Sequence, residues 1–142
     1  MLKRLLLLKF IPLRPDFGLL ALRIIAMLPL FMKHGTEKIF RFHMMAAHFP
    51  DPIHIGALPS LIFAMISDAI CSLLVIAGLA TRWAALIIFI NIFVAWAFVH
   101  HFALFGPQGD HGELILLYLG AMVLLFFTGA GKYSIDAALG RR

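Results

Sequence analysis

Three polar side chains interrupt long apolar runs of the sequence, and their types make them the first candidates for chemistry. Arg23, Asp68 and Asn91 each lie within a mainly hydrophobic stretch. If these stretches cross a bilayer, a charge near its centre costs at least about 2.5 kcal/mol and needs a partner or water. One interpretation is a buried ion pair between Arg23 and Asp68, steadied by Asn91, that fixes the register of the helices. The alternative is a polar pocket that binds a ligand head group or relays protons.

A second group of polar residues follows the first apolar run. Helical spacing places His34 over Lys38 and Lys33 over Glu37, because residues i and i+4 share a face. Histidine exchanges protons near neutral pH, so His34 beside Lys38 suits proton exchange with a ligand carbonyl. The alternative is a solvated helix end with surface ion pairs.

A third group combines imidazole and carboxylate side chains, which together suit zinc, copper or iron. The predicted metal ligands are His100, His101, His111 and Glu113. Adjacent residues on a helix diverge by about 100°, so His100 and His101 can bind one ion together only where the helix has ended. The alternatives are polar loop histidines, and a Glu113 that favours the N-terminus of a helix as an acidic first-turn residue.

The elements that position these residues follow from composition. The 142-residue chain is 63% hydrophobic and 13% charged, with a mean hydropathy of +0.99, so the lipid bilayer is its expected solvent. A spanning helix needs about 20 mainly apolar residues, and four such spans fill nearly the whole sequence. We predict an all-α integral membrane protein, a four-helix transmembrane bundle that forms a single domain over residues 1–142, with helices at about 17–40, 58–79, 83–103 and 113–129.

Proline and glycine residues divide these helices. Pro29 lacks a backbone N–H and is expected to kink or loosen the first span. The sequence Pro50-Asp51-Pro52 forbids a regular helix and marks an extramembrane loop. Gly78 is suited to end the second span, so the second and third spans are predicted to form a tight antiparallel hairpin.

Basic residues indicate how the bundle sits in the membrane. The formal net charge of +5 comes from residues scattered between apolar runs, a pattern that orients membrane proteins, and we predict no nucleic-acid partner. One side of the predicted bundle holds Lys3, Arg4, Lys9, Arg14, Arg82, Lys132, Arg141 and Arg142. The other side holds only Lys33, Lys38 and Arg41. The more basic side is expected to be cytoplasmic, so both termini are predicted to be cytoplasmic and every histidine to face outward.

Four short segments, taken in order, resemble those of one family. They are Leu22-Arg23, His34-Gly35-Thr36-Glu37-Lys38, Gly78-Leu79-Ala80-Thr81-Arg82 and Gly129-Ala130-Gly131-Lys132-Tyr133-Ser134-Ile135-Asp136. Their order and their places in a four-helix pattern resemble the DoxX family over roughly residues 18–137. The sequence departs from the family at Asp68, where glutamate is more frequent, and at Ala130, where proline is frequent. The shorter carboxylate alters the reach of an ion pair.

The resemblance implies a small multi-pass protein of the bacterial inner (cytoplasmic) membrane. Some relatives are linked to quinone-dependent oxidation of sulfur compounds, and others to membrane complexes for oxidative-stress defence. We therefore predict the membrane subunit of a quinone-linked oxidoreductase system, with a quinone as cofactor. Its catalytic residues would be Arg23, His34, Lys38 and Asp68, and its cofactor-binding residues Asn91 and Glu37.

The chain needs a partner on this interpretation. Cys71 is the only cysteine, so a cysteine-built zinc or iron–sulfur site is not available within one chain. The sequence shows no flavin, haem or cluster motif, and a soluble or membrane protein partner is expected to exchange electrons with the quinone. The chain could also assemble with further copies of itself into a homo-oligomer. The alternative function is a non-catalytic membrane accessory that assembles another complex or handles a metal ion through the outer-face histidines.

Overall fold

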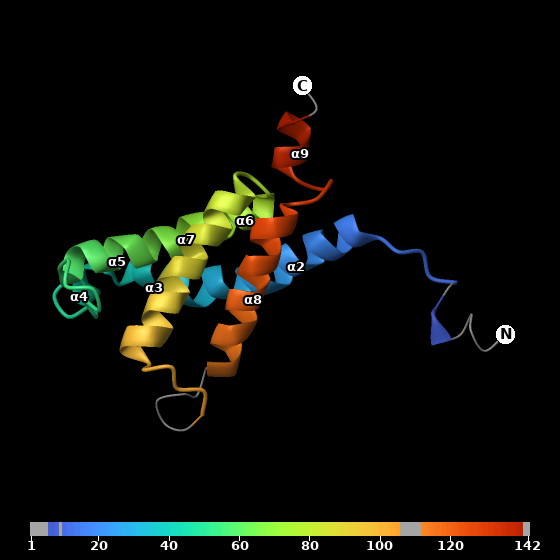
Figure 1. The fold of residues 1–142 in the computed structure, drawn as a ribbon. Coiled ribbons are helices and arrows are strands. Elements are labelled where there is room, and N and C mark those ends of the chain that lie inside the picture. The colour runs from blue at the N-terminus through green and yellow to red at the C-terminus, as the bar shows by residue number, and fades with distance from the viewer. Residues whose placement is uncertain (1–5, 9, 106–111, 141–142) are drawn as a thin grey trace.

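The computed structural model describes residues 6–8, 10–105 and 112–140, which form helices joined by turns and loops (Figure 1). No strand occurs among these residues, so the predicted all-α class is confirmed for this part of the chain. Helices are labelled α, and π-helical segments are labelled η. In chain order they are α2 (Pro15–Leu30), η1 (Phe31–Gly35), α3 (Thr36–Phe40), α4 (Phe42–Met45), α5 (Ala57–Met65), η2 (Ile66–Cys71), α6 (Ser72–Ala77), α7 (Thr81–Val94), η3 (Ala95–Val99), α8 (Gly112–Thr128) and α9 (Ile135–Leu139).

Several of these elements join end to end into long apolar helices. The continuous helices Pro15–Phe40, Ala57–Ala77 and Thr81–Val99 each contain an 18-residue stretch of high mean hydropathy, 1.6, 2.2 and 2.0 respectively, and each helix is long enough to cross a bilayer. The fourth apolar helix, α8, is shorter. The chain is therefore a helical multi-pass membrane protein.

A π-helical segment lies within or at the end of each of the three long helices. η1 begins two residues after Pro29, whose missing N–H and bulky ring disturb the regular hydrogen-bond ladder. The first helix thus loosens where the sequence predicted. η2 contains Asp68, and η3 ends the third helix at Val99. Because π turns inside helices occur frequently at functional sites, η1 and η2 direct attention to the side chains that they carry.

The long helices pack in two pairs. α2 contacts α6 while η1 contacts η2, so the first helix runs antiparallel to the second. α7 packs along α8, and this pair crosses the first pair in Figure 1. Side chains from all four helices fill the shared core, among them Met27, Val75, Ile88, Met122 and Leu125.

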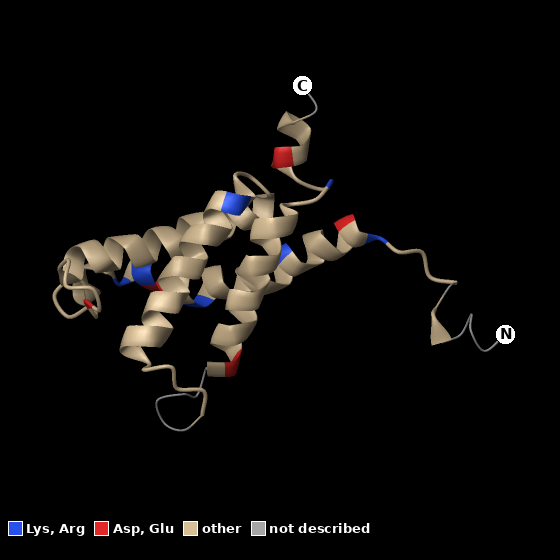
Figure 2. Ribbon diagram, in the orientation of Figure 1, with Lys and Arg blue, Asp and Glu red and all other residues tan. Residues whose placement is uncertain are grey.

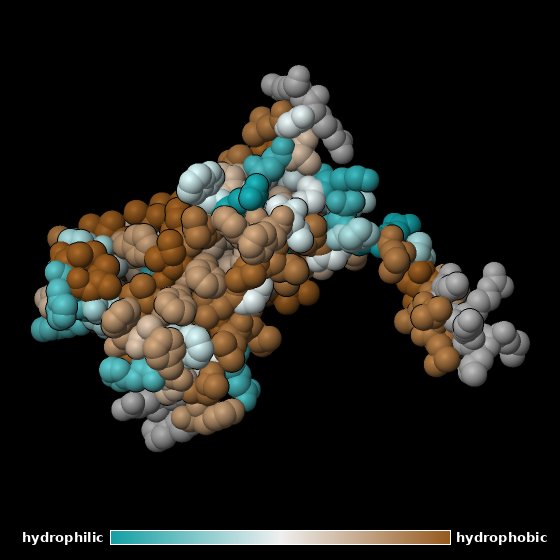
Figure 3. Space-filling view, in the orientation of Figure 1, coloured by the Kyte–Doolittle hydropathy of each residue, from teal (hydrophilic) through white to brown (hydrophobic). Residues whose placement is uncertain are grey.

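The outer surface of the bundle is apolar. Long stretches of α5 to α8 carry no charged residue (Figure 2), and hydrophobic side chains spread over the visible face (Figure 3). Phe40, Leu117 and Phe127 are among the most exposed hydrophobic side chains. Such an exterior is stable in contact with lipid chains rather than with water.

The C-terminal segment folds back over the turn between the second and third helices. Gly78 ends α6 in the left-handed conformation, with φ at +72°, and its carbonyl accepts a hydrogen bond from the Asp136 N–H at 2.8 Å. The Asp136 carboxylate accepts hydrogen bonds from the N–H groups of Ala80 at 2.7 Å and Thr81 at 3.0 Å. Asp136 therefore caps the N-terminus of α7, and the predicted helix stop at Gly78 is confirmed.

Candidate functional site

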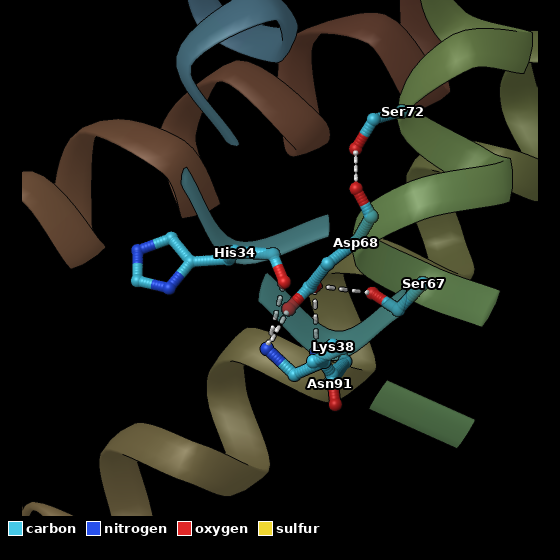
Figure 4. Close-up of polar contacts among 6 residues, drawn as sticks. All are labelled: His34, Lys38, Ser67, Asp68, Ser72 and Asn91. Atoms are coloured by element: carbon cyan, nitrogen blue, oxygen red, sulfur yellow. Dashed lines mark hydrogen bonds and ion pairs between the residues drawn. The ribbon is translucent and has the colours of Figure 1, made fainter. Parts of the chain in front are cut away.

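Asp68 is the centre of a polar cluster buried between the three long helices (Figure 4). Its Oδ2 lies 2.8 Å from Nζ of Lys38. Its Oδ1 accepts hydrogen bonds from Nδ2 of Asn91 at 3.0 Å and from Oγ of Ser67 at 3.1 Å. The Lys38 and Asp68 side chains are only 10% and 7% exposed. Both carboxylate oxygens are thus supplied with donors, as a buried ion pair requires to offset its desolvation.

A close helix crossing brings Lys38 to Asp68. A Cβ atom at Gly35 would lie 2.6 Å from the Asp68 carbonyl oxygen and 3.1 Å from Cα of Ala69, so a residue with a side chain does not fit there. The same carbonyl accepts a hydrogen bond from Oγ of Ser72 at 2.7 Å. Gly35 therefore lets η1 touch η2, and Lys38, nearly one turn further along, reaches the carboxylate.

A cavity of about 500 Å³ opens beside this cluster. That volume is within the range of small-molecule binding sites, which are mostly apolar with a few placed polar groups. The three side chains Lys38, Asp68 and Asn91 supply polar groups to its wall. The rest of the wall is mainly apolar and comes from the three long helices, from α8 and from the loop before α5, including Leu30, Phe49, Pro52, Ile53, Phe63, Ala64, Ile92, Val99 and Ile115.

The structure separates the residues of the predicted second group. Lys33 and His34 line the cavity with Lys38, although the His34 ring points away from Asp68 in Figure 4. The His34 carbonyl accepts a hydrogen bond from Nζ of Lys38 at 3.4 Å. Glu37 does not line the cavity; its exposed carboxylate lies 3.5 Å from Nη1 of Arg41. Glu37 thus belongs to a surface ion pair, which was the alternative for this group. Lys33, His34 and Lys38 belong to the cavity.

The predicted ion pair between Arg23 and Asp68 is wrong. Arg23 is fully buried, but its guanidinium donates hydrogen bonds to the backbone carbonyls of Val75 and Ile76, at 3.4 and 3.5 Å, and of Tyr133. The antiparallel register explains this, because Asp68 lies opposite Gly35, about 18 Å along the first helix from Arg23. Arg23 does not line the cavity and instead joins the end of α6 to the C-terminal segment.

The structure describes only three of the four predicted metal ligands, His100, His101 and Glu113. His111 lies outside the described residues. Across residues 6–8, 10–105 and 112–140, no three His, Cys, Asp or Glu side chains gather as a metal site requires. The helix has ended by His100, which lines the cavity, and His101 is exposed. A site that includes His111 stays a prediction.

Ser67 and Tyr118 are among the polar side chains at the site that sequence reasoning missed. Ser67 hydrogen-bonds to Asp68 although adjacent residues on a regular helix point about 100° apart, so spacing gave no signal. Tyr118 lines the cavity from α8. A lone phenol in an otherwise apolar run was a usable signal, because a tyrosine in a membrane interior needs a polar neighbour for its hydroxyl.

Apolar helices around a buried ion pair and an adjoining cavity define a class, the small multi-pass membrane proteins with a polar site inside the bundle. Within that class, this chain belongs to the DoxX family. The family's profile, described as DoxX, matches residues 18–101, which include Lys38, Asp68 and Asn91. The resemblance predicted from the sequence is confirmed.

Two uncharacterised proteins of Haemophilus influenzae are similar to this chain. One is 36% identical over 132 residues, which cover 87% of this chain and 90% of the relative. The other is 36% identical over 76 residues, 54% of this chain and 50% of the relative. No solved structure matches the chain. The comparisons therefore identify the family, and the function has to be argued from the site.

Proposed function

We propose that this protein is the membrane subunit of a quinone-linked oxidoreductase system and that the cavity beside Asp68 holds the quinone. One observation carries the proposal: a mainly apolar cavity of about 500 Å³, between membrane-spanning helices, has a buried Lys38–Asp68 pair in its wall. An apolar molecule with a polar head group fits such a site. When bound, a quinone accepts two electrons and two protons and becomes a quinol.

The side chains around the cavity have hydrogen-bonding capacity left for a ligand. The Lys38 ammonium has three N–H donors, and the described residues use two of them, through Asp68 and the His34 carbonyl. Asn91 donates one amide N–H to Asp68, and its second N–H and its carbonyl oxygen have no partner in the described part of the chain. Lys38 and Asn91 would therefore hold the head-group oxygens, while Asp68 positions both of them.

Proton exchange at this site falls to Lys38 and His34. The Lys38 ammonium, which contacts the Asp68 carboxylate, and the His34 imidazole both line this cavity, and both side chains can bind and release a proton. Electrons would come from a redox partner protein, soluble or membrane-bound, since the sequence has no flavin, haem or cluster motif of its own. Neither Arg23 nor Glu37 has a part in this proposal, because neither lines the cavity.

The protein would lie in a bacterial inner membrane with both termini in the cytoplasm. Lys132 lies 3.7 Å from Asp16, and Arg82 donates to the Phe126 carbonyl, so these basic residues are at the end of the bundle where the chain enters and leaves. The opposite end of the bundle carries only Lys33, Lys38 and Arg41. The larger number of basic residues near the termini favours a cytoplasmic location for them. The cavity would then lie in the periplasmic half.

Quinone binding to matched variants tests the proposal. The detergent-purified protein is expected to carry co-purified quinone, found by mass spectrometry, and to bind added quinone. The double variant Lys38→Met/Asp68→Leu removes the pair without leaving one charge buried, so it should fold, and its quinone affinity should fall about tenfold or more. The control Glu37→Gln/Arg41→Gln removes an exposed pair on the same helix and should bind as the natural protein does.

Two results would contradict the proposal. Equal quinone affinity in both double variants would show that the buried pair does not contact the head group. Absence of quinone together with a bound metal ion would favour the accessory function and the outer-face histidines instead.

A further inference from the structure

A second cavity, at the other end of the bundle, shares no lining residue with the first. It has a volume of about 430 Å³ and lies between the N-terminus of α7 and the C-terminal end of α8. Thr81, Arg82, Trp83, Phe126 and Asp136 line it. These residues mark the end of two spans, the level at which the polar heads of phospholipids meet the protein.

The lining of this cavity includes the positively charged Arg82, whose guanidinium makes only one of its possible hydrogen bonds to the described residues. Nε of Arg82 donates to the Phe126 carbonyl at 2.9 Å, and the guanidinium lies over the Phe126 ring, 5.3 Å from its centroid. This contact holds the side chain in place. Neither terminal amino group of the guanidinium has a hydrogen-bond partner among the residues that the structure describes, and their planar fork suits phosphate.

The lining of the cavity also includes a carboxylate and a buried hydroxyl. Asp136 accepts two backbone hydrogen bonds, and its carboxylate oxygens have lone pairs left. Thr81 is 0% exposed, and its Oγ1 has no hydrogen-bond partner among the described residues. Buried hydroxyls are nearly always paired, so an unpaired one in a cavity wall points to a ligand.

The apolar neighbours of these groups suit a lipid. Trp83, which lines the cavity, is 71% exposed, and indole rings prefer the membrane interface. Leu86 and the Phe126 ring continue the wall along α7 and α8. A head group bound between Arg82 and Asp136 would leave its acyl chains against these apolar side chains.

We propose that this cavity binds the head group of a phospholipid with a primary ammonium, a phosphatidylethanolamine. The phosphate contacts the Arg82 guanidinium and accepts from the Thr81 hydroxyl, and the ammonium donates to Asp136. A purely anionic lipid would meet the Asp136 carboxylate, and a quaternary ammonium has no N–H to donate. This proposal concerns a different cavity from the quinone site and does not depend on it.

Native mass spectrometry of the full chain in detergent, with synthetic phospholipids added singly, tests the site. Phosphatidylethanolamine should bind about tenfold more tightly than phosphatidylcholine or phosphatidylglycerol of the same acyl chains, as for one charge-assisted hydrogen bond. Thr81→Val should weaken phosphatidylethanolamine binding by a similar factor. The melting temperature of this variant without lipid should stay equal or rise, because the hydroxyl has no hydrogen-bond partner to lose within residues 6–8, 10–105 and 112–140.

The matched control is Arg41→Gln, an exposed arginine at the other end of the bundle, compared with Arg82→Gln. Only Arg82→Gln should lower lipid binding. Equal binding of the three lipids, or unchanged binding by Thr81→Val, would overturn the proposal. Competition by soluble glycerophosphoethanolamine at the same concentration as the lipid would also overturn it, by showing a site for a free phosphate ester.

Discussion

At the scale of single residues, the arrangement around Asp68 explains why charges persist inside this bundle. The carboxylate has an ammonium, an amide and a hydroxyl as donors, all at 2.8 to 3.1 Å. A pair as buried as Lys38–Asp68 adds little net stability when intact, but loss of one partner leaves an uncompensated charge. Net stability alone therefore does not account for the pair, and its position in the wall of a cavity supports the ligand site that we propose.

Removal of the carboxylate alone should destabilise the fold strongly. Asp68→Asn leaves the Lys38 ammonium buried without a counter-ion, and we expect a loss of about 3–5 kcal/mol in the free energy of unfolding. Glu37→Gln, which breaks an exposed pair, should cost no more than about 1 kcal/mol. Unfolding of both variants in detergent, followed by circular dichroism, makes the comparison. Similar losses would mean that Lys38 is solvated and that the site is not buried as described.

At the scale of elements, one glycine decides how the C-terminal segment docks. A Cβ at Gly78 would overlap the Arg23 guanidinium and lie 2.5 Å from Cβ of Ser134, at a φ of +72° that alanine adopts poorly. Gly78→Ala should therefore cost more than the roughly 1–2 kcal/mol of the left-handed conformation alone. Gly120→Ala is the matched control, because that glycine lies within α8 with open space around it. It should stabilise the protein by up to about 1 kcal/mol. Melting temperatures that fall equally would refute this account of the turn.

The loop that covers the first cavity is held by one carboxylate. Asp51 accepts hydrogen bonds from the N–H groups of Ile55 at 3.0 Å and Gly56 at 2.8 Å, and from Oγ of Ser60 at 2.9 Å. Desolvation raises the pKa of Asp51, but these hydrogen bonds outweigh it and hold the pKa below the ordinary value of 3.8. The carboxylate therefore stabilises the loop above about that pH, and the stabilisation is lost as the pH falls through the lower pKa of the folded state.

Asp51→Asn should loosen this loop at neutral pH. Hydrogen exchange of residues 46–56, measured by mass spectrometry at matched intrinsic rates, should be faster in the variant than in the natural protein at pH 7. The difference should shrink as the pH falls below 4. A difference that persists at low pH would mean that the charge of Asp51 does not hold the loop.

The sequence predicted elements better than contacts. Pro29, Gly78 and the apolar runs placed the helices to within about a turn, because hydropathy and backbone constraints are local. The predicted Arg23–Asp68 pair was wrong because contacts between helices depend on their register, which the positions of single polar residues do not reveal. The crossing at Gly35 and the two π turns set the register, and neither follows from the spacing of hydrophobic residues. The apolar walls of the cavity likewise arise from four separate helices and a loop, so no single motif carries them.

At the scale of the whole molecule, the distribution of charge determines the expected orientation. A fluorescent protein that folds only in the cytoplasm should be bright when fused after the last residue and dark when inserted into the 46–56 loop. The expected contrast follows from the unequal number of basic residues at the two ends of the bundle. Reversed brightness would place the cavity in the cytoplasmic half and would require a cytoplasmic source of protons.

The most direct test of the quinone site is photo-crosslinking with a photoreactive quinone analogue, followed by peptide mapping. The label is expected on peptides that contain Lys38, Asp68 or Asn91 and should disappear when natural quinone is added in excess. Label that natural quinone does not displace, or label confined to the Arg82 end of the bundle, would contradict a quinone site in the cavity beside Asp68.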